Sequence, residues 1–228
     1  MDESPDTALR DRRARAGFTL VEIIIAVAIL AILAGMLTPL VASYIDSARV
    51  SRARSETQML ASSINRLYSD TGFWPITNAN GPSGRIDRVI TSTNVATGAG
   101  PGAGPGAANW GTATPAKQIG DFLYWNNPDN DSSSTGGSQN QANQDYPTTG
   151  DNRWRGPYLK DYIQNDPWGR AYVINARFFP GGAYGGNRRH KIMVLSAGPD
   201  GRWQTRWRNN QTEPGPEGDD IGYVIAVD

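Results

Sequence analysis

The sequence contains no cysteine and only one histidine, so disulfides and thiolate metal sites are excluded, while the redox compartment stays undetermined. Its 22 basic and 22 acidic side chains cancel, and without a basic excess we expect no nucleic-acid partner. We find no phosphate-cradling loop and no convincing arrangement of nucleophile and base. The sequence therefore predicts a protein that is not an enzyme.

The one long apolar run extends from Phe18 to Leu40, and four arginines precede it. At about 1.5 Å per residue, a helix of this length crosses a hydrocarbon core of about 30 Å. A secretory signal peptide is a poor interpretation, because the run is too long and no A-x-A site follows it. An ordinary membrane anchor explains the length and the arginines but not Glu22, whose carboxylate is costly in a membrane unless it is paired. The segment holds no lysine or arginine, but a new amino terminus just before Phe18 would supply a cation.

The residues from Arg15 to Glu22, RAGFTLVE, resemble the processing motif of type IV prepilins. In that family a peptidase on the cytoplasmic side cuts after the glycine and methylates the new phenylalanine amine. The resemblance implies a leader over residues 1–17, processing at Gly17 and Phe18, and a role for Glu22 in assembly.

A long helix is predicted over residues 18–72, of which about 18–41 span the membrane. Residues 42–70 contain no proline or glycine, and their apolar residues follow roughly the period of an amphipathic helix. Gly72 is expected to end the helix as a left-handed cap, and Pro39 to kink or locally melt it.

Residues 76–152 are predicted to be a low-complexity insertion. Within it, the Gly-Pro-Ala repeat from Gly98 to Ala108 has the composition of a linker. The apolar patches Arg85 to Ile90 and Ile119 to Trp125 are expected to dock on the head. The stretch from Asp129 to Ser133 briefly resembles the start of a calcium loop but lacks its later ligand positions.

The sequence after residue 153 carries several short motifs. They are GPYL from Gly156, DPWG from Asp166, SAGPDG from Ser196 and EGDDI from Glu217. Strands are predicted between and after these motifs, at Tyr172 to Ile174, Lys191 to Leu195 and Val224 to Val227. The order of the motifs resembles the major pseudopilin of type II secretion systems. In that family the last two motifs bind calcium, which implies Asp200, Asp219, Asp220 and the Ala197 carbonyl as ligands here. The segments 76–152 and 202–216 are longer than in that family.

The resemblance covers residues 15–75 and 153–223, and it implies an α+β fold. The expected architecture is a long N-terminal helix, with a transmembrane first half, packed on a small antiparallel sheet in a periplasmic head over residues 73–228. The implied function is a structural subunit of a periplasmic pseudopilus in type II secretion, anchored by a single pass in the bacterial inner membrane. The implied partners are further copies, other pseudopilins, the prepilin peptidase and an inner-membrane assembly platform.

Two alternatives stay open from the sequence. A type IV pilus subunit for adhesion, motility or DNA uptake would share the helix and differ in the head. A membrane-anchored enzyme with its site in the insertion would need neither Glu22 nor a cut at Gly17.

Overall fold

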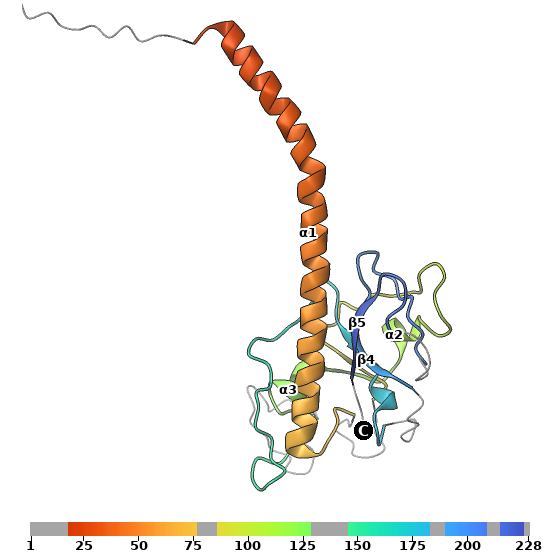
Figure 1. Cartoon of the computed structure of the whole chain (residues 1–228). Coiled ribbons are helices and arrows are strands. Elements are labelled where there is room, and N and C mark those ends of the chain that lie inside the picture. Colours follow the sequence, from red (N-terminus) through yellow and green to blue (C-terminus); the bar gives the residue numbers. More distant parts are fainter. Residues whose placement is uncertain (1–17, 77–85, 129–145, 183–189, 209–214, 226–228) are drawn as a thin grey trace, which may run out of the picture. The chain divides into compact units, whose positions relative to one another are not determined.

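The computed structural model describes residues 18–76, 86–128, 146–182, 190–208 and 215–225 (Figure 1). Two compact units make up the chain, residues 1–46 and 47–228, and each is described by itself.

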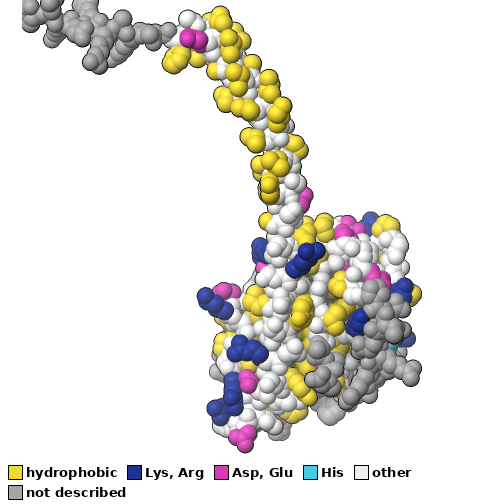
Figure 2. All heavy atoms as spheres, in the orientation of Figure 1, with side chains coloured by type: hydrophobic (Ala, Val, Ile, Leu, Met, Phe, Trp, Pro, Cys, Tyr) yellow, Lys and Arg dark blue, Asp and Glu magenta, His cyan; other side chains and the backbone are white. Residues whose placement is uncertain are grey.

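The first unit holds the apolar start of helix α1, which runs from Leu20 to Thr71 and contains Pro39. The helix is continuous through Pro39, so of the two effects expected there, a kink or local melting, melting does not occur. Among the described residues, α1 is the one helix long and apolar enough to cross a membrane, and none of its most apolar window is buried. Figure 2 shows hydrophobic side chains along this part of α1.

The second unit holds the rest of α1, which turns an apolar face toward the core. Ala53, Leu60, Ile64 and Leu67 are fully buried, at the helical spacing that the sequence predicted. The helix ends at Gly72, whose φ of 75° is left-handed and whose N–H donates to the Tyr68 carbonyl at 2.7 Å. Gly72 is therefore the predicted cap.

A five-stranded sheet in the order β2-β1-β3-β4-β5 completes the core. The strands are β1 (Arg88–Ile90), β2 (Ala116–Gln118), β3 (Val173–Ile174), β4 (Ile192–Ser196) and β5 (Ile221–Ile225). The α+β class is confirmed, and the three strands predicted in the C-terminal half are present, with β5 beginning earlier than expected. The sheet is mixed, because β1 and β2 pair in parallel while the other pairs are antiparallel.

The insertion supplies β1, β2 and two short helices, α2 (Asn109–Thr112) and α3 (Ile119–Leu123). Ile86, Val89 and Phe122 are fully buried in the same core as β3 and β4, so the two apolar patches dock as predicted. Another short helix, η1 (Ala176–Phe178), follows β3. Much of the insertion is thus part of the folded head.

The expectation that Gly98 to Ala108 is a linker is wrong. The repeat folds into two successive turns, in which Ala103 N–H donates to the Gly100 carbonyl and Ala107 N–H to the Gly104 carbonyl, each at 3.2 Å. In each turn a proline is followed by a glycine with φ of 72°, which is the signature of a type II turn. Composition suggested flexibility, but the repeat encodes specific turns. The calcium-loop-like stretch from Asp129 to Ser133 lies outside the described residues.

Candidate functional site

The start of α1 carries the predicted assembly residue. The Glu22 carboxylate accepts hydrogen bonds from the Thr19 N–H at 2.8 Å and the Thr19 hydroxyl at 2.9 Å, and Glu22 N–H donates back to that hydroxyl at 3.3 Å. This reciprocal pattern is a capping box, which the spacing T-x-x-E encodes. Phe18 is 84% exposed, and Gly17 lies outside the described residues. We had expected a cation beside Glu22; within the described chain, Thr19 satisfies it.

The second candidate site is formed by two acidic loops, residues 196–201 and 216–220. They lie in direct contact, since a Cβ added at Gly198 would overlap the Asp219 carbonyl. Asp200 N–H donates to the Asp219 carboxylate at 3.3 Å. The structure thus brings the predicted residues Asp200 and Asp219 together across the two loops.

The third predicted acid, Asp220, faces a different part of the loop region. One oxygen of its carboxylate accepts the backbone N–H groups of Gln204 at 2.9 Å and Thr205 at 2.7 Å. Burial raises the pKa of Asp220 to about 6, the neighbouring Asp219 carboxylate adds to this, and the hydrogen bonds from Thr205 and Gln204 oppose it. Asp220 therefore anchors residues 204–205, a role that sequence reasoning missed.

Some features of the acidic loops fit a cation and others do not. The second carboxylate oxygens of Asp219 and Asp220 are both buried without a hydrogen-bond partner, which is a costly state for a carboxylate. Ala197, in the first acidic loop, is fully buried. However, nowhere in the described part of the chain do three acidic or imidazole side chains converge as a metal-binding group. A calcium ion here would need backbone carbonyls, which it accepts readily, to complete its shell.

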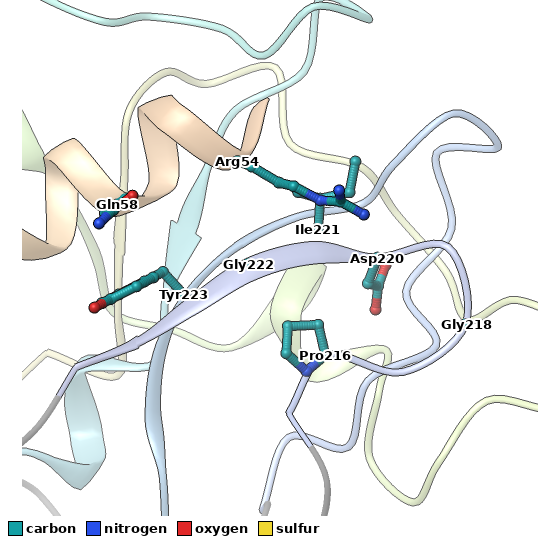
Figure 3. Close-up of a pocket in the computed structure, with 8 residues that line it drawn as sticks. All are labelled: Arg54, Gln58, Pro216, Gly218, Asp220, Ile221, Gly222 and Tyr223. Carbon is teal, nitrogen blue, oxygen red and sulfur yellow. The ribbon is translucent and has the colours of Figure 1, made fainter. Parts of the chain in front are cut away.

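A groove of about 450 Å³ opens beside the acidic loops. Figure 3 shows that Arg54 and Gln58 from α1 line one side, and Asp220 and Tyr223 line the other. The groove therefore lies between the helix and the end of the chain, next to the candidate metal ligands.

Two further side chains organise the site region and were not singled out from the sequence. The Asp166 carboxylate accepts N–H bonds from Trp168 at 3.0 Å and Arg170 at 2.8 Å, and a bond from the Ser196 hydroxyl at 2.6 Å. It thereby fixes the DPWG turn against the start of the first acidic loop. The Tyr172 hydroxyl donates to the Glu56 carboxylate of α1 and so links the sheet to the helix.

Two family models match the chain, one at the start of α1 and one in the C-terminal half. Residues 12–38 match the model of the prokaryotic N-terminal methylation motif, a range that includes Gly17, Phe18 and Glu22. This motif continues directly into the long apolar helix, an arrangement in which the chain resembles type IV pilin-like proteins.

Residues 134–212 match the model of type II secretion system protein G. The chain is 38% identical over 66 residues to a type II secretion system core protein G of Pseudomonas aeruginosa, covering 29% of this chain and 46% of that protein. These matches support a major pseudopilin of the protein G type.

A fimbrial protein, EcpC of Eikenella corrodens, is also similar, with 34% identity over 68 residues, covering 30% of this chain and 44% of that protein. The chain thus spans less than half the length of the curated relatives it matches. No solved structure matches the chain.

Proposed function

We propose that the chain is a structural, non-enzymatic subunit of a periplasmic pseudopilus that drives protein export through a type II secretion system. The observation that carries this proposal is one chain with a methylation motif, an apolar helix behind it and a protein G match in its head. The partners would be further copies, other pseudopilins, the prepilin peptidase and the inner-membrane platform, with the head in the periplasm.

The proposed mechanism uses surface that a single chain leaves uncovered. Large apolar side chains from Phe18 to Val41 are half or more exposed. Packing these side chains between neighbouring helices in the membrane and filament would cover them. Glu22 would exchange its Thr19 capping bonds for the methylated amine of a neighbour's Phe18, which neutralises a carboxylate that is costly in an apolar setting.

Crosslinking in cells tests this proposal, because the chain has no native thiol to interfere. A variant with cysteines replacing Ile24 and Leu33, both exposed on α1, is oxidised in intact cells. We expect a ladder of disulfide-linked multimers, because each subunit would contact neighbours on both sides. The same variant with Glu22→Ala should give a much weaker ladder. Monomers and dimers alone would contradict a filament and favour an ordinary anchored protein.

A type IV pilus subunit is the second candidate, and the similarity to a fimbrial protein favours it. Deleting the gene separates the two. Loss of secreted proteins with surface pili intact supports the pseudopilus, whereas loss of pili with secretion intact supports the alternative.

We also propose calcium as the ligand of the acidic loops, held by Asp200, Asp219, Asp220 and the Ala197 carbonyl. The two buried carboxylate oxygens without partners support this choice. The ion would supply positive charge between carboxylates that otherwise repel one another, and it would fasten the two loops together.

A further inference from the structure

The Gly-Pro-Ala repeat lies along residues 203–205, which precede the second acidic loop. Ala99 bridges in parallel to Trp203. Gly100 N–H donates to the Trp203 carbonyl at 2.9 Å, and Gly104 N–H donates to the Gln204 carbonyl at 2.8 Å. The repeat therefore pairs with residues 203–205 through backbone hydrogen bonds, as a β-strand would.

Three tryptophans lock the two segments together. Trp110, Trp203 and Trp207 are almost fully buried, and their rings lie 6.0 Å (Trp110 to Trp203) and 4.9 Å (Trp110 to Trp207) apart. The Trp110 indole N–H donates to the Thr205 carbonyl at 3.0 Å, and the Trp203 indole N–H donates to the Ala96 carbonyl at 2.8 Å. Each segment thus supplies a backbone carbonyl that accepts the indole N–H of a buried tryptophan on the other segment.

Two glycines of this contact, Gly104 and Gly111, have no room for a side chain. A Cβ at Gly104 would overlap the Arg206 side chain and approach Glu217, and one at Gly111 would overlap the Ala96 carbonyl. Gly215, in contrast, has no atom within 4 Å of such a Cβ. Close packing therefore depends on glycine at positions 104 and 111 but not at 215.

The segment that the repeat holds is also the segment that holds Asp220, through the Gln204 and Thr205 N–H groups. Glu217 N–H donates to the Thr205 hydroxyl at 2.9 Å, and the Arg206 and Glu217 side chains form an ion pair at 3.3 Å. A chain of contacts thus runs from the insertion, through residues 203–207, to the second acidic loop.

We propose that residues 96–111 and 203–207 form a glycine–tryptophan clamp that positions Asp220 and orders the second acidic loop without any metal. The clamp joins the insertion to the segment that precedes the second acidic loop, and it gives the insertion a role. Its effect on calcium affinity rests on the calcium site proposed above; its effect on loop order does not.

Hydrogen exchange on the full chain in detergent tests the clamp. We expect a peptide covering 203–207 to stay protected in chelator, because its amides bond within the protein. Gly111→Ala and Gly104→Ala should speed exchange there about tenfold or more, while the peptide covering β4 keeps its protection. Gly215→Ala, the matched control, should change neither peptide.

A gentler variant guards against general misfolding. Trp110→Phe keeps an aromatic ring but removes the hydrogen bond to the Thr205 carbonyl, so it should open residues 203–207 in the same direction and to a smaller extent. Rapid exchange of residues 203–207 in the unmodified chain on chelation, or unchanged exchange in all three clamp variants, would overturn the proposal.

Calcium titration measures whether the clamp also affects calcium affinity, which hydrogen exchange does not report. If the unmodified chain binds calcium, the clamp variants should bind it several-fold more weakly and Gly215→Ala should bind it normally; equal affinity in all would refute the positioning role. If the unmodified chain binds no calcium, the metal proposal fails while hydrogen exchange still decides whether the clamp exists.

Discussion

The Glu22 carboxylate at the start of the helix has one observed partner and one proposed partner. Glu22 caps α1 through Thr19 in the isolated chain, and we propose that it meets a neighbour's amine in the filament. The capping box was readable from Thr19-x-x-Glu22. The pairing across subunits depends on a cut that only the resemblance to prepilins predicts.

Processing at Gly17 is the first prediction. We expect intact-mass analysis of the protein from native membranes to give a chain that starts at a methylated Phe18. Gly17→Val should leave the chain uncut, because it places a bulky side chain beside the scissile bond. A conservative change outside the motif, Val41→Ile, should be processed normally. A mature chain with any other first residue would refute the assignment.

Asp121 provides a pH-dependent prediction. It is 6% exposed, and burial raises its pKa from an ordinary 3.8 to about 6, against the opposing effects of Lys117 and a hydrogen bond from Gln118. The folded state therefore holds the proton more tightly than the unfolded state. Ionisation destabilises the fold progressively as the pH rises from about 4, and the loss is complete above about 6.

Asp121→Asn should remove this loss. The difference in melting temperature, variant minus unmodified chain, should increase as the pH rises from about 4 to 7. The increase should correspond to a free energy of unfolding on the order of 2 kcal/mol. Asp151→Asn, at an exposed loop position, should show no such trend. A constant difference across this range would show that the Asp121 carboxyl is not destabilised by burial.

The elements divide into those with local signals and those without. Helix α1, its cap at Gly72 and the DPWG turn follow from periodicity, glycine and proline, all of which act within a few residues. The turns at Pro101 and Pro105 also have local sequence signals. Whether the repeat is a folded part of the head depends on its pairing with Trp203, about a hundred residues away in sequence. The parallel pairing of β1 with β2 could not be predicted either, because it joins segments that are separated in sequence.

A contact between elements gives the third prediction. The buried Tyr172 hydroxyl donates to Glu56, whose side chain is 13% exposed and also pairs with Arg52 at 2.8 Å. Tyr172→Phe removes this link between α1 and the sheet and should lower the free energy of unfolding by about 1–2 kcal/mol. Tyr223→Phe, at a residue that is 43% exposed, is the control. Equal stability of both variants would mean that the hydrogen bond contributes nothing.

At the scale of the whole molecule, calcium gives the fourth prediction. The full chain in detergent should melt at a higher temperature in calcium than in chelator. At a calcium concentration a hundred times the dissociation constant, the ion would raise the free energy of unfolding by about 2.7 kcal/mol. Magnesium should do less, because it demands a tight octahedral shell. Asp200→Ala should abolish the calcium effect and Asp151→Ala should not. Identical melting with and without calcium would reject the site.

The acidic loops show how far the sequence could go toward a site. The resemblance to pseudopilins implied that Asp200 and Asp219 share one site, and their loops are in contact. It did not predict that the Asp220 carboxylate accepts hydrogen bonds from the backbone of Gln204 and Thr205, because no local pattern links residues that lie 16 and 15 positions apart in sequence.

The sheet order has a practical consequence for anyone who shortens this protein. Strand β1, from the insertion, pairs with β3 through Val89 opposite Ile174 and Ile90 opposite Val173. Removing residues 76–152 would leave the backbone N–H and C=O groups on one side of β3 without partners, beside apolar side chains. An unprotected strand edge of this kind recruits strands from other molecules. The trimmed protein should aggregate, and the insertion should be kept in any form made for crystallisation.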